Sequence, residues 1–538
     1  MNAKPNLPTK AAVFLLLVFL NSLWLTRIVL AQAPAANQNV FLPLVVNEAQ
    51  GRTLPTPTPL ATPSATTQPN QPTPTPTATV QPTPAPSSAG LFMETEWRTS
   101  SASLKVDQQG GQHVGYYYYE GMHDNAPNYA VYAYCASQCE KSEQWQRVNL
   151  AQDRDVIEVQ LALTKAGQPR MLIRADSTVY SGAKDYLYAA CDQSCTNANN
   201  WQIGYVATTD GTDIFDVYDD DAPQHSFALD PQDRPRFVFQ DRNYAHAEPD
   251  LYGAYYAACD ADCTAGTPDN PTWTRTRVTN EVKGDFIYEY EIIDYPSLTF
   301  TSQGAPRFIG SLIPTNQSGD PQGLYYFGCD SGCDQQENWQ RIFLIDRGAG
   351  TDPSWDLTLD KQDRPRLAFY KGQADLAGEK LLYIWCNENC FDKASRDAQW
   401  SYNDPGVPTS SGKHPDLELD SQSRPHIAYN DASDGGLGYV WCSANCETDN
   451  PTYQHKVVES VDLLQQTWPV AIPPHCDGGL WHGITPILAL DGANKPHVAY
   501  DATYHARCLY DDPSDGQPPV YAFHLIVRAV RETSFALP

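Results

Sequence analysis

The 538-residue sequence predicts an all-β fold, a seven-bladed β-propeller built from four-stranded antiparallel blades. Two observations support this prediction. A fourteen-residue pattern occurs seven times without an internal gap, and a Cys-x-x-x-Cys pair follows six of the copies. The copies begin 57 to 71 residues apart, which is enough for four short strands and their turns. A string of β-sandwiches or a β-solenoid explains seven copies of one four-strand pattern less directly.

The N-terminal residues 1–33 are predicted to be an export signal. Lys4 and Lys10 supply positive charge, an apolar run follows over residues 11–26, and small residues precede position 34. A retained membrane anchor is the alternative. The apolar run is shorter than the roughly 20 residues that a spanning helix needs, and Arg27 ends it, so we favour a cleaved signal.

Residues 34–90 are predicted to be a disordered stalk, because residues 55–88 consist almost entirely of Pro, Thr, Ala and Gln. Such a composition cannot form a core, and dense proline favours an extended chain. The propeller is expected to span residues 91–538. Fourteen cysteines in an exported chain indicate disulfides, and we expect the protein to be secreted or displayed at the cell surface.

Each fourteen-residue copy is predicted to form a tight hairpin, the first two strands of a blade. In LALDGANKPHVAYD from Leu488 and LELDSQSRPHIAYN from Leu417, apolar residues alternate on both sides of a polar turn. Proline stands at the first residue of the second strand, where a missing donor is tolerated. The acid that ends the first strand fits an Asx-type turn; these acids are Asp230, Asp360, Asp420 and Asp491. The residues after proline are expected to make turn or interblade contacts; they are Arg236, Arg366, His426 and His497.

The third and fourth strands are predicted from a second recurrent spacing. A tyrosine lies three residues before the first cysteine of each pair, and an aromatic residue follows the second cysteine; we expect both to pack between blades. The short spacing favours six local disulfides over redox or zinc sites. The predicted pairs are Cys135–Cys139, Cys191–Cys195, Cys259–Cys263, Cys329–Cys333, Cys386–Cys390 and Cys442–Cys446.

The seventh blade has a clear hairpin but few residues for a fourth strand. Its third strand is expected at residues 520–527, with Tyr521 at the tyrosine position. Residues 96–98, Glu-Trp-Arg, resemble the fourth strand of another blade, so we predict that the N-terminal segment supplies the missing outer strand. Cys476 and Cys508 are expected in two loops on one face, as a seventh disulfide.

The formal net charge of −28 excludes some partners. Binding to nucleic acid depends on Lys and Arg neutralising phosphates, so a nucleic-acid ligand is not expected, and anionic membranes are disfavoured for the same reason. No segment after the signal is apolar enough to span a bilayer, and we expect a monomer.

A ligand site is predicted at the mouth of the ring, where loops enter each first strand and leave each second strand. The candidates are His225, Tyr295, Trp355, Asp356, His414, Asp416, Trp481, His482, Glu120, Asp241, Asp431 and Asp501. Two of these loops are acidic and aromatic, around residues 218–221 and 288–291. Carboxylates beside aromatics suit sugar binding, Ca²⁺ ligation or acid/base hydrolysis. No cofactor is predicted beyond a possible Ca²⁺ ion at Asp219, Asp220 and Asp221. The alternative is that these acids only solvate an exported protein.

The phrase L-x-L-D-x-x-x-x-P-x-h-x-Y-D, repeated around a ring, resembles the sialidase-like (BNR-type) group of propellers over residues 91–538. The resemblance implies the architecture. It does not extend to activity, because the Asp-box phrase Ser-x-Asp-x-Gly-x-x-Trp is absent, as is the arginine triad that clamps a substrate carboxylate. At the end of the second strand only one repeat has an arginine, Arg174.

Three functions follow as hypotheses. The favoured one is an exported binding or adhesion module with a carbohydrate ligand at the mouth, not an enzyme. The alternative is a carboxylate-dependent glycoside hydrolase or polysaccharide lyase, which predicts two carboxylates about 5–10 Å apart in a cleft beside an aromatic platform. The third is a structural surface scaffold, which predicts no concave polar pocket.

Overall fold

The computed structural model describes residues 91–537 except 93–98, 120–127, 152–153, 180–182, 211–224, 242–252, 269, 280–290, 314–319, 347–353, 372–379, 409–410, 432–435, 468–475, 482–484 and 511–519. The chain divides into two units, Met1–Pro82 and Thr83–Pro538, and all described residues belong to the second. The predicted signal and stalk therefore lie outside the described residues.

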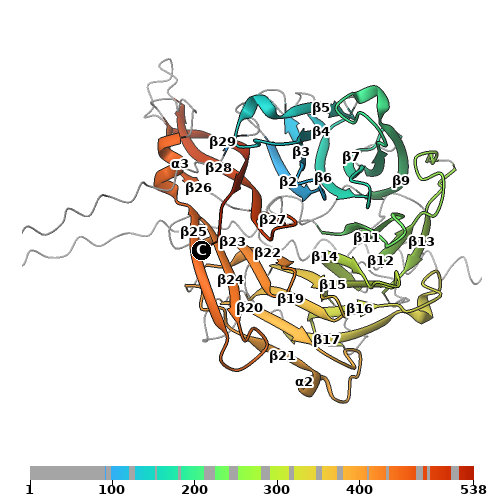
Figure 1. The fold of residues 1–538 in the computed structure, drawn as a ribbon. Helices are drawn as coiled ribbons and strands as arrows, with labels where there is room; N and C mark the ends of the chain where they lie inside the picture. The colour runs from blue at the N-terminus through green and yellow to red at the C-terminus, as the bar shows by residue number, and fades with distance from the viewer. Residues whose placement is uncertain are drawn as a thin grey trace, which may run out of the picture. The chain divides into compact units, whose positions relative to one another are not determined.

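The second unit is a seven-bladed β-propeller, as predicted (Figure 1). Each of the first six blades is an antiparallel sheet whose four strands pair in chain order. Blade 1 consists of β2 (Thr99–Val106), β3 (Gln112–Tyr119), β4 (Asn128–Cys135) and β5 (Gln146–Leu150). Blade 2 consists of β6 (Val156–Leu163), β7 (Pro169–Asp176), β8 (Ala183–Ala190) and β9 (Gln202–Asp210). Blade 3 consists of β10 (Phe227–Leu229), β11 (Pro235–Asp241), β12 (Gly253–Ala258) and β13 (Thr274–Arg277).

The next three blades repeat this order. Blade 4 consists of β14 (Ile292–Phe300), β15 (Pro306–Ile313), β16 (Gly323–Gly328) and β17 (Gln340–Asp346). Blade 5 consists of β18 (Ser354–Leu359), β19 (Pro365–Lys371), β20 (Lys380–Cys386) and β21 (Trp400–Asn403). Blade 6 consists of β22 (Lys413–Leu419), β23 (Pro425–Asp431), β24 (Gly436–Ala444) and β25 (Thr452–Glu459). The first strand of each blade contacts the first strands of its neighbours, so these strands surround a central channel.

The chain closes the ring with its N-terminal segment. Blade 7 consists of β27 (Ile487–Leu490), β28 (Pro496–Tyr510), β29 (Val520–Ser534) and, as its outer strand, β1 (Leu91–Phe92). Leu91 pairs with Glu532 and Phe92 with Arg531. Closure by the N-terminal segment is therefore confirmed, whereas the predicted residues 96–98 lie outside the described ones.

Two details of blade 7 differ from the prediction. In blade 6, Tyr439 pairs with Ala428, but the corresponding Ala499 pairs with Glu532, so Tyr521 is not at the tyrosine position; it pairs with Leu509. The cause is that β28 continues to Tyr510 instead of ending near Asp501. An additional strand, β26 (Cys476–Trp481), pairs with this continuation, and Cys476 lies directly opposite Cys508. Both cysteines are thus in strands and not in loops; their side chains lie outside the described ones.

The hairpins form as the sequence predicts. Six second strands begin at the repeat's proline, as in β19 and β23. Asp420 Oδ1 accepts hydrogen bonds from the backbone N–H groups of Gln422 (2.8 Å) and Arg424 (2.9 Å), which is the expected Asx-type turn. The turn residue Ser423 has a φ of 60°, and the equivalent position in blade 1 is Gly110 at 84°. The repeat therefore places Gly, Asp, Asn or Ser where the backbone must be left-handed.

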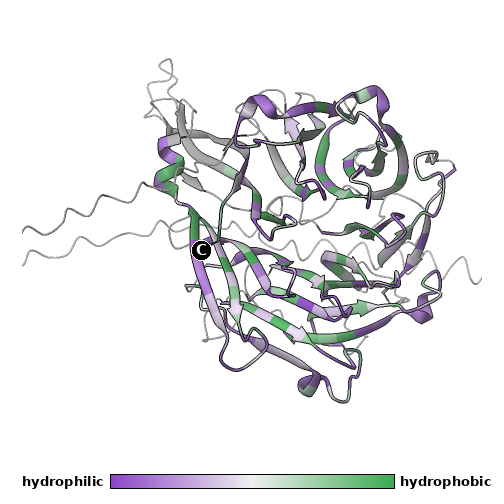
Figure 2. Ribbon diagram, viewed as in Figure 1, coloured by the Kyte–Doolittle hydropathy of each residue, from purple (hydrophilic) through white to green (hydrophobic). Residues whose placement is uncertain are grey.

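The hydrophobic core is divided among the blade interfaces. Each buried cluster joins two consecutive blades, and one of them joins blade 1 to blade 7. Hydrophobic residues follow the strands, as Figure 2 shows. The recurrent aromatics pack across these interfaces as predicted: Tyr132 of blade 1 lies 5.1 Å from Trp201 of blade 2, ring centroid to ring centroid. Trp201 Nε1 also donates to the carbonyl of Cys195 (2.7 Å), and this bond recurs in other blades.

All six predicted Cys-x-x-x-Cys disulfides are present, each linking a third strand to the turn that follows it. Arg366 lies beside one of them, where it pairs with Asp360 (2.9 Å) and donates to the carbonyl of Cys386. The post-proline residues therefore make the local contacts that were expected. Helices are few and short among the described residues: η1 (Ser142–Gln144), η2 (Ala198–Asn200), η4 (Gln336–Asn338), α2 (Arg396–Gln399) and α3 (Val461–Thr467). None of the described helices has the length and apolarity needed to cross a membrane.

Candidate functional site in the central channel

A cavity of about 310 Å³ lies in the central channel, lined by the first strands of all seven blades. In six of the seven repeats the residue just before the first apolar residue lines it. Since side chains alternate along a strand, the residue two positions later lines it as well. The first set comprises Ser103, Gln160, Ser297, Asp356, Asp416 and Ile487, and the second includes Lys105, Thr299, Thr358 and Glu418.

Polar side chains of the first set link consecutive blades. Asp356 Oδ2 accepts a hydrogen bond from the backbone N–H of Leu417 (2.9 Å), and Asp416 Oδ2 accepts one from Leu488 (2.8 Å). Ser103 and Gln160 accept equivalent bonds from blades 2 and 3. These side chains satisfy backbone donors that the inner strands leave unpaired, so they hold neighbouring blades together.

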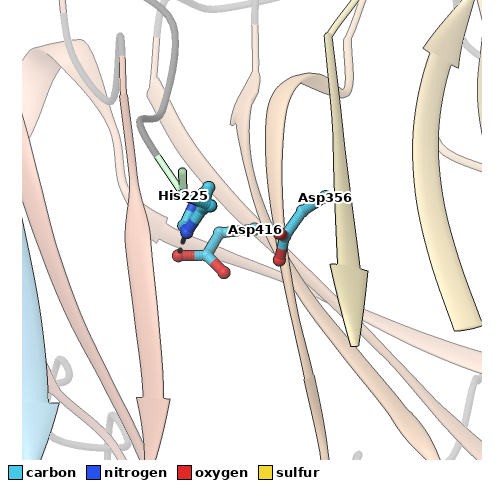
Figure 3. A group of neighbouring side chains, drawn as sticks. All are labelled: His225, Asp356 and Asp416. Carbon is cyan, nitrogen blue, oxygen red and sulfur yellow. Dashed lines mark ion pairs between the residues drawn. The ribbon is translucent and has the colours of Figure 1, made fainter. Parts of the chain in front are cut away.

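Three of the predicted candidates come together in this channel (Figure 3). One ring nitrogen of His225, one oxygen of Asp356 and one oxygen of Asp416 all lie within 4.8 Å of one another. His225 Nε2 lies 3.9 Å from Asp416 Oδ2. The three residues belong to blades 3, 5 and 6, so only ring closure brings them together.

The two carboxylates have different surroundings. Asp356 is 4% exposed and accepts three hydrogen bonds: from the hydroxyl of Ser297 (2.7 Å), and from the backbone N–H groups of Leu357 and Leu417. Donors placed in this way stabilise a charged carboxylate. Asp416 is 3% exposed and accepts a hydrogen bond from the backbone N–H of Leu488, so fewer donors surround it than surround Asp356.

Burial decides the electrostatics of the channel. It raises the pKa of Asp416 well above its usual value, and the negative charges of Asp356 and Glu418 raise it further. Burial also raises the pKa of Glu418 to about 7, although Lys105 opposes the shift. Burial lowers the pKa of His225, so its imidazole is neutral at neutral pH, and Asp356 opposes that shift. The channel thus holds a neutral histidine and two acids, Asp416 and Glu418, whose pKa values are raised.

This arrangement has two chemical capabilities. One imidazole nitrogen and two carboxylate oxygens form a donor set that suits a divalent cation such as Zn²⁺ or Mn²⁺, with room left for a further ligand. Alternatively, two carboxyl groups with one oxygen of each within 4.8 Å, one of them with a raised pKa, are able to act as a general acid and its partner base.

The predicted aromatic platform is not formed by the two described aromatics of the candidate set. Trp355 is 3% exposed, and its Nε1 donates to the carbonyl of Tyr295 (2.7 Å); the two rings pack edge to face. Both side chains belong to the interface between blades 4 and 5, because the chain at Tyr295 adopts a left-handed φ of 48° within a β-bulge.

Other candidates have structural partners. His414 is turned into the protein by a bulge like that of Tyr295; its backbone N–H binds the hydroxyl of Ser354 (2.7 Å), and burial lowers its pKa to about 3. Asp431 accepts from the hydroxyl of Ser411, and Asp501 accepts from Thr485. Neither belongs to the channel cluster.

Several candidates cannot be placed. His482, Glu120, Asp219, Asp220 and Asp221 lie outside the described residues, as do the side chains of Trp481 and Asp241. Of the acidic segment 288–291, only Glu291 is described. It is 1% exposed and makes a two-pronged ion pair with Arg341 (2.7 and 2.9 Å), so it is a structural acid.

Glu418 and Lys105 were not among the candidates predicted from the sequence, and the linking role of Gln160 and Ser297 was not predicted either. A signal was present for three of them, because Glu418 is on the same strand face as Asp416, and Gln160 and Ser297 are in the repeat position of Asp356 and Asp416.

The fold therefore defines a seven-bladed propeller of the kind that the sialidase-like resemblance implies, with a carboxylate-lined channel. No protein-family model and no curated protein sequence matches the chain. Similar solved structures include a protein of unknown function from Dyadobacter fermentans, at 10% identity and a TM-score of 0.37, covering 83% of this chain and 98% of that one. An α-L-arabinofuranosidase from Fusarium graminearum has 13% identity and a TM-score of 0.38, covering 64% and 92%. A leech intramolecular trans-sialidase has 10% identity and a TM-score of 0.36, covering 83% and 70%.

Proposed function

We propose that the propeller is a carboxylate-dependent glycoside hydrolase that acts at its central channel. The observation that supports this most directly is the approach of Asp356 and Asp416, with one oxygen of each within 4.8 Å. Glycosidases that retain configuration use two carboxyl groups about 5–5.5 Å apart. The hydrolase hypothesis, unlike the binding hypothesis, predicted two close carboxylates. It also predicted an aromatic platform, which Trp355 and Tyr295 do not form.

In this proposal Asp416 is the general acid and Asp356 is the second carboxylate. Burial and neighbouring negative charge raise the pKa of Asp416, so it carries a proton under conditions in which an ordinary aspartate has lost it. Asp356 is surrounded by three donors that stabilise its charge. His225 Nε2 lies 3.9 Å from Asp416 Oδ2, beside this carboxyl. Asp416 would donate its proton to the glycosidic oxygen of the leaving group.

The size of the channel favours a terminal sugar unit as the substrate. At about 310 Å³ the cavity is at the lower end of the range for small-molecule sites, and seven strands enclose its sides. A chain end enters such a cavity more readily than an internal unit of a polymer. We place the enzyme outside the cell, as a stalk-borne monomer, on the basis of residues 1–90 and the disulfides.

The test is hydrolysis of a panel of aryl glycosides and oligosaccharides by the purified full-length chain. Asp416→Asn and Asp356→Asn should each lower kcat by about 10²–10⁴-fold, since each removes an acid/base group but leaves one oxygen to accept the interblade bond. Asp449→Asn, at an exposed position, is the matched control and should keep full activity. No hydrolysis of any substrate by the unaltered protein, or full activity in both channel variants, would refute the proposal.

A second candidate is a cation-dependent binding module, the hypothesis first favoured from the sequence. It is supported by His225 Nε2, which is buried and has no hydrogen-bond partner among the described residues. Calorimetric titration of the EDTA-treated protein with Zn²⁺, Mn²⁺ and Ca²⁺, followed by a glycan array, tests it. Cation binding lost in His225→Ala, together with glycan binding without turnover, would favour this candidate. The scaffold hypothesis predicted no concave polar pocket, whereas the channel contains one.

A further inference from the structure

Besides blade 7, the repeat varies in the loop between the second cysteine and the tryptophan, outside the channel. In blades 1, 2 and 4 the tryptophan follows the second cysteine by six residues, as in Cys333 and Trp339; in blades 3 and 5 the separation is ten. The insertion of blade 3 packs directly on blade 2. The backbone N–H of Tyr205 donates to the carbonyl of Gly266 (3.0 Å), and a Cβ on Gly204 would come within 2.4 Å of the backbone of Thr264.

The insertion of blade 5 packs on blade 4 through a side chain, because the ring of Phe391 stacks on Tyr326 with the ring centroids 4.8 Å apart. It contains Lys393 and the short helix α2, which lie near β17, the outer strand of blade 4 (Figure 1). Two cavities of about 430 and 470 Å³ lie between these elements. Both are lined by Asp320, Arg341 and Lys393, so they adjoin; together they are called the blade 4–5 groove here.

Cationic and aromatic side chains meet in the blade 4–5 groove. Its charged lining residues are three cations and two anions in a chain of net charge −28: Arg341, Lys393, Arg396, Asp320 and Asp397. Three half-buried aromatic side chains also line it, namely Trp339, Phe343 and Phe391. The guanidinium of Arg396 lies 5.4 Å from the centre of the Phe343 ring. The lining of the groove therefore has one cation more than it has anions, although the buried Glu291 behind it offsets Arg341, and it includes half-buried aromatic side chains.

The groove is held in place, and one of its cations is not paired. Arg341 is fixed by its two-pronged bond to the buried Glu291 and a further bond to Asp320 (2.5 Å). The ammonium of Lys393, in contrast, is exposed, and no described residue pairs with it. Lys393 lines both cavities, so its charge is available to an incoming anion at the point where they meet.

We propose that the blade 4–5 groove binds a uronic-acid-containing oligosaccharide. One uronic acid unit presents an apolar ring face and a carboxylate together, which is the combination that Phe343 and Lys393 complement. An aspartate or glutamate side chain has the carboxylate without the ring face, so an acidic peptide fits less well. The cavities have the size of small-molecule sites. This inference goes beyond the proposed hydrolase, because it uses none of the channel residues.

The test is calorimetric titration of the full chain with trigalacturonate and with its methyl-esterified, uncharged form. Trigalacturonate should bind, more weakly as salt rises, and the ester should bind at least tenfold more weakly. Lys393→Glu should lower the affinity for trigalacturonate roughly tenfold or more, and Phe343→Leu should lower it with little change in the salt dependence. Lys141→Glu is the matched control, since Lys141 is an exposed lysine in the corresponding loop of blade 1, and it should bind like the unaltered chain.

Four results would overturn the inference: no binding of trigalacturonate, equal binding of the ester, no effect of Lys393→Glu, or the same loss in Lys141→Glu. Competition by a polyglutamate peptide with the same dependence on Lys393 and Phe343 would assign the groove to acidic peptides instead. The inference is separable from the proposed function, because Asp416→Asn should keep full trigalacturonate binding, and Lys393→Glu should keep hydrolysis of small aryl glycosides.

Discussion

Asp416 Oδ2 accepts a 2.8 Å hydrogen bond from the backbone N–H of Leu488, so a channel carboxyl of blade 6 holds the inner strand of blade 7. The same carboxyl is within reach of His225 and Asp356. One side chain therefore contributes to closing the ring and to the candidate site, and the two contributions are separable by substitution.

The interblade role of Asp416 predicts different effects for two substitutions. Asp416→Ala removes the acceptor and leaves the Leu488 N–H buried and unsatisfied, which should lower the free energy of unfolding by about 1–3 kcal/mol. Asp416→Asn keeps an acceptor and removes a buried acid, so its free energy of unfolding should equal or exceed that of the unaltered protein at pH 8. Urea unfolding of both variants at pH 8 measures this. A larger loss in the Asn variant than in the Ala variant would contradict the assigned role.

The raised pKa of Glu418 predicts that stability falls as the pH rises. Its pKa changes from a usual 4.5 to about 7, so between these values the folded protein binds more protons than the unfolded chain. The free energy of unfolding should therefore decrease from about pH 4.5 to about pH 7. Glu418→Gln should reduce this decrease and be the more stable protein at pH 8. Melting temperatures across this range, measured with EDTA, test the sign; an unchanged profile in Glu418→Gln would exclude Glu418 as its source.

The contact between Tyr132 and Trp201 predicts that blade interfaces carry much of the stability. Trp201 is 8% exposed, packs on Tyr132 and donates to the carbonyl of Cys195. Trp201→Ala should cost about 3–5 kcal/mol of the free energy of unfolding, because it leaves a cavity and an unsatisfied carbonyl. Tyr402→Ala, at a side chain that is 67% exposed, should cost less than about 0.5 kcal/mol. Similar losses in the two variants would contradict this prediction.

The register of blade 7 supports the predicted seventh disulfide. Cys476 and Cys508 are direct partners in the antiparallel pair of β26 and β28, and partners of this kind bring two Cβ atoms within the range that a disulfide bridges. Mass spectrometry of peptides from the non-reduced, thiol-alkylated protein should detect a fragment that links the two cysteines. Recovery of both as alkylated thiols, while the six local disulfides remain intact, would show that the prediction is wrong.

Features that depend on neighbours in sequence could be predicted with precision. The Asx turn at Asp420, the proline that begins the second strand and the disulfides are local, since each joins residues a few positions apart. The interblade packing of Tyr132 and Trp201 could also be predicted, because a repeated spacing implies a repeated contact. The prediction for Tyr521 was wrong, because blade 7 departs from the repeat: β28 continues past Asp501, and only pairing partners fix the register.

The candidate site was predicted only in part. His225, Asp356 and Asp416 were predicted from their positions where the chain enters inner strands. The same reasoning selected Tyr295 and Trp355, which pack between blades 4 and 5, and His414, whose backbone N–H binds Ser354. The difference depends on backbone bulges at Tyr295 and His414, which the sequence pattern does not reveal. Glu418 and Lys105 were not predicted because they lie within inner strands, on the face that continues from the strand entry into the channel.

The sequence by itself determined the blade, its number of copies, its disulfides and the way the ring closes, because hydrophobic alternation and repeat spacing are one-dimensional signals. Only the tertiary structure decided which of the scattered acids meet. His225, Asp356 and Asp416 belong to three different blades, and closing the ring places them around one narrow channel. Asp356 and Asp416, which were expected at an open mouth, are buried in this channel beside the partly buried His225. Burial, which no sequence pattern specifies, raises the pKa of Asp416 there.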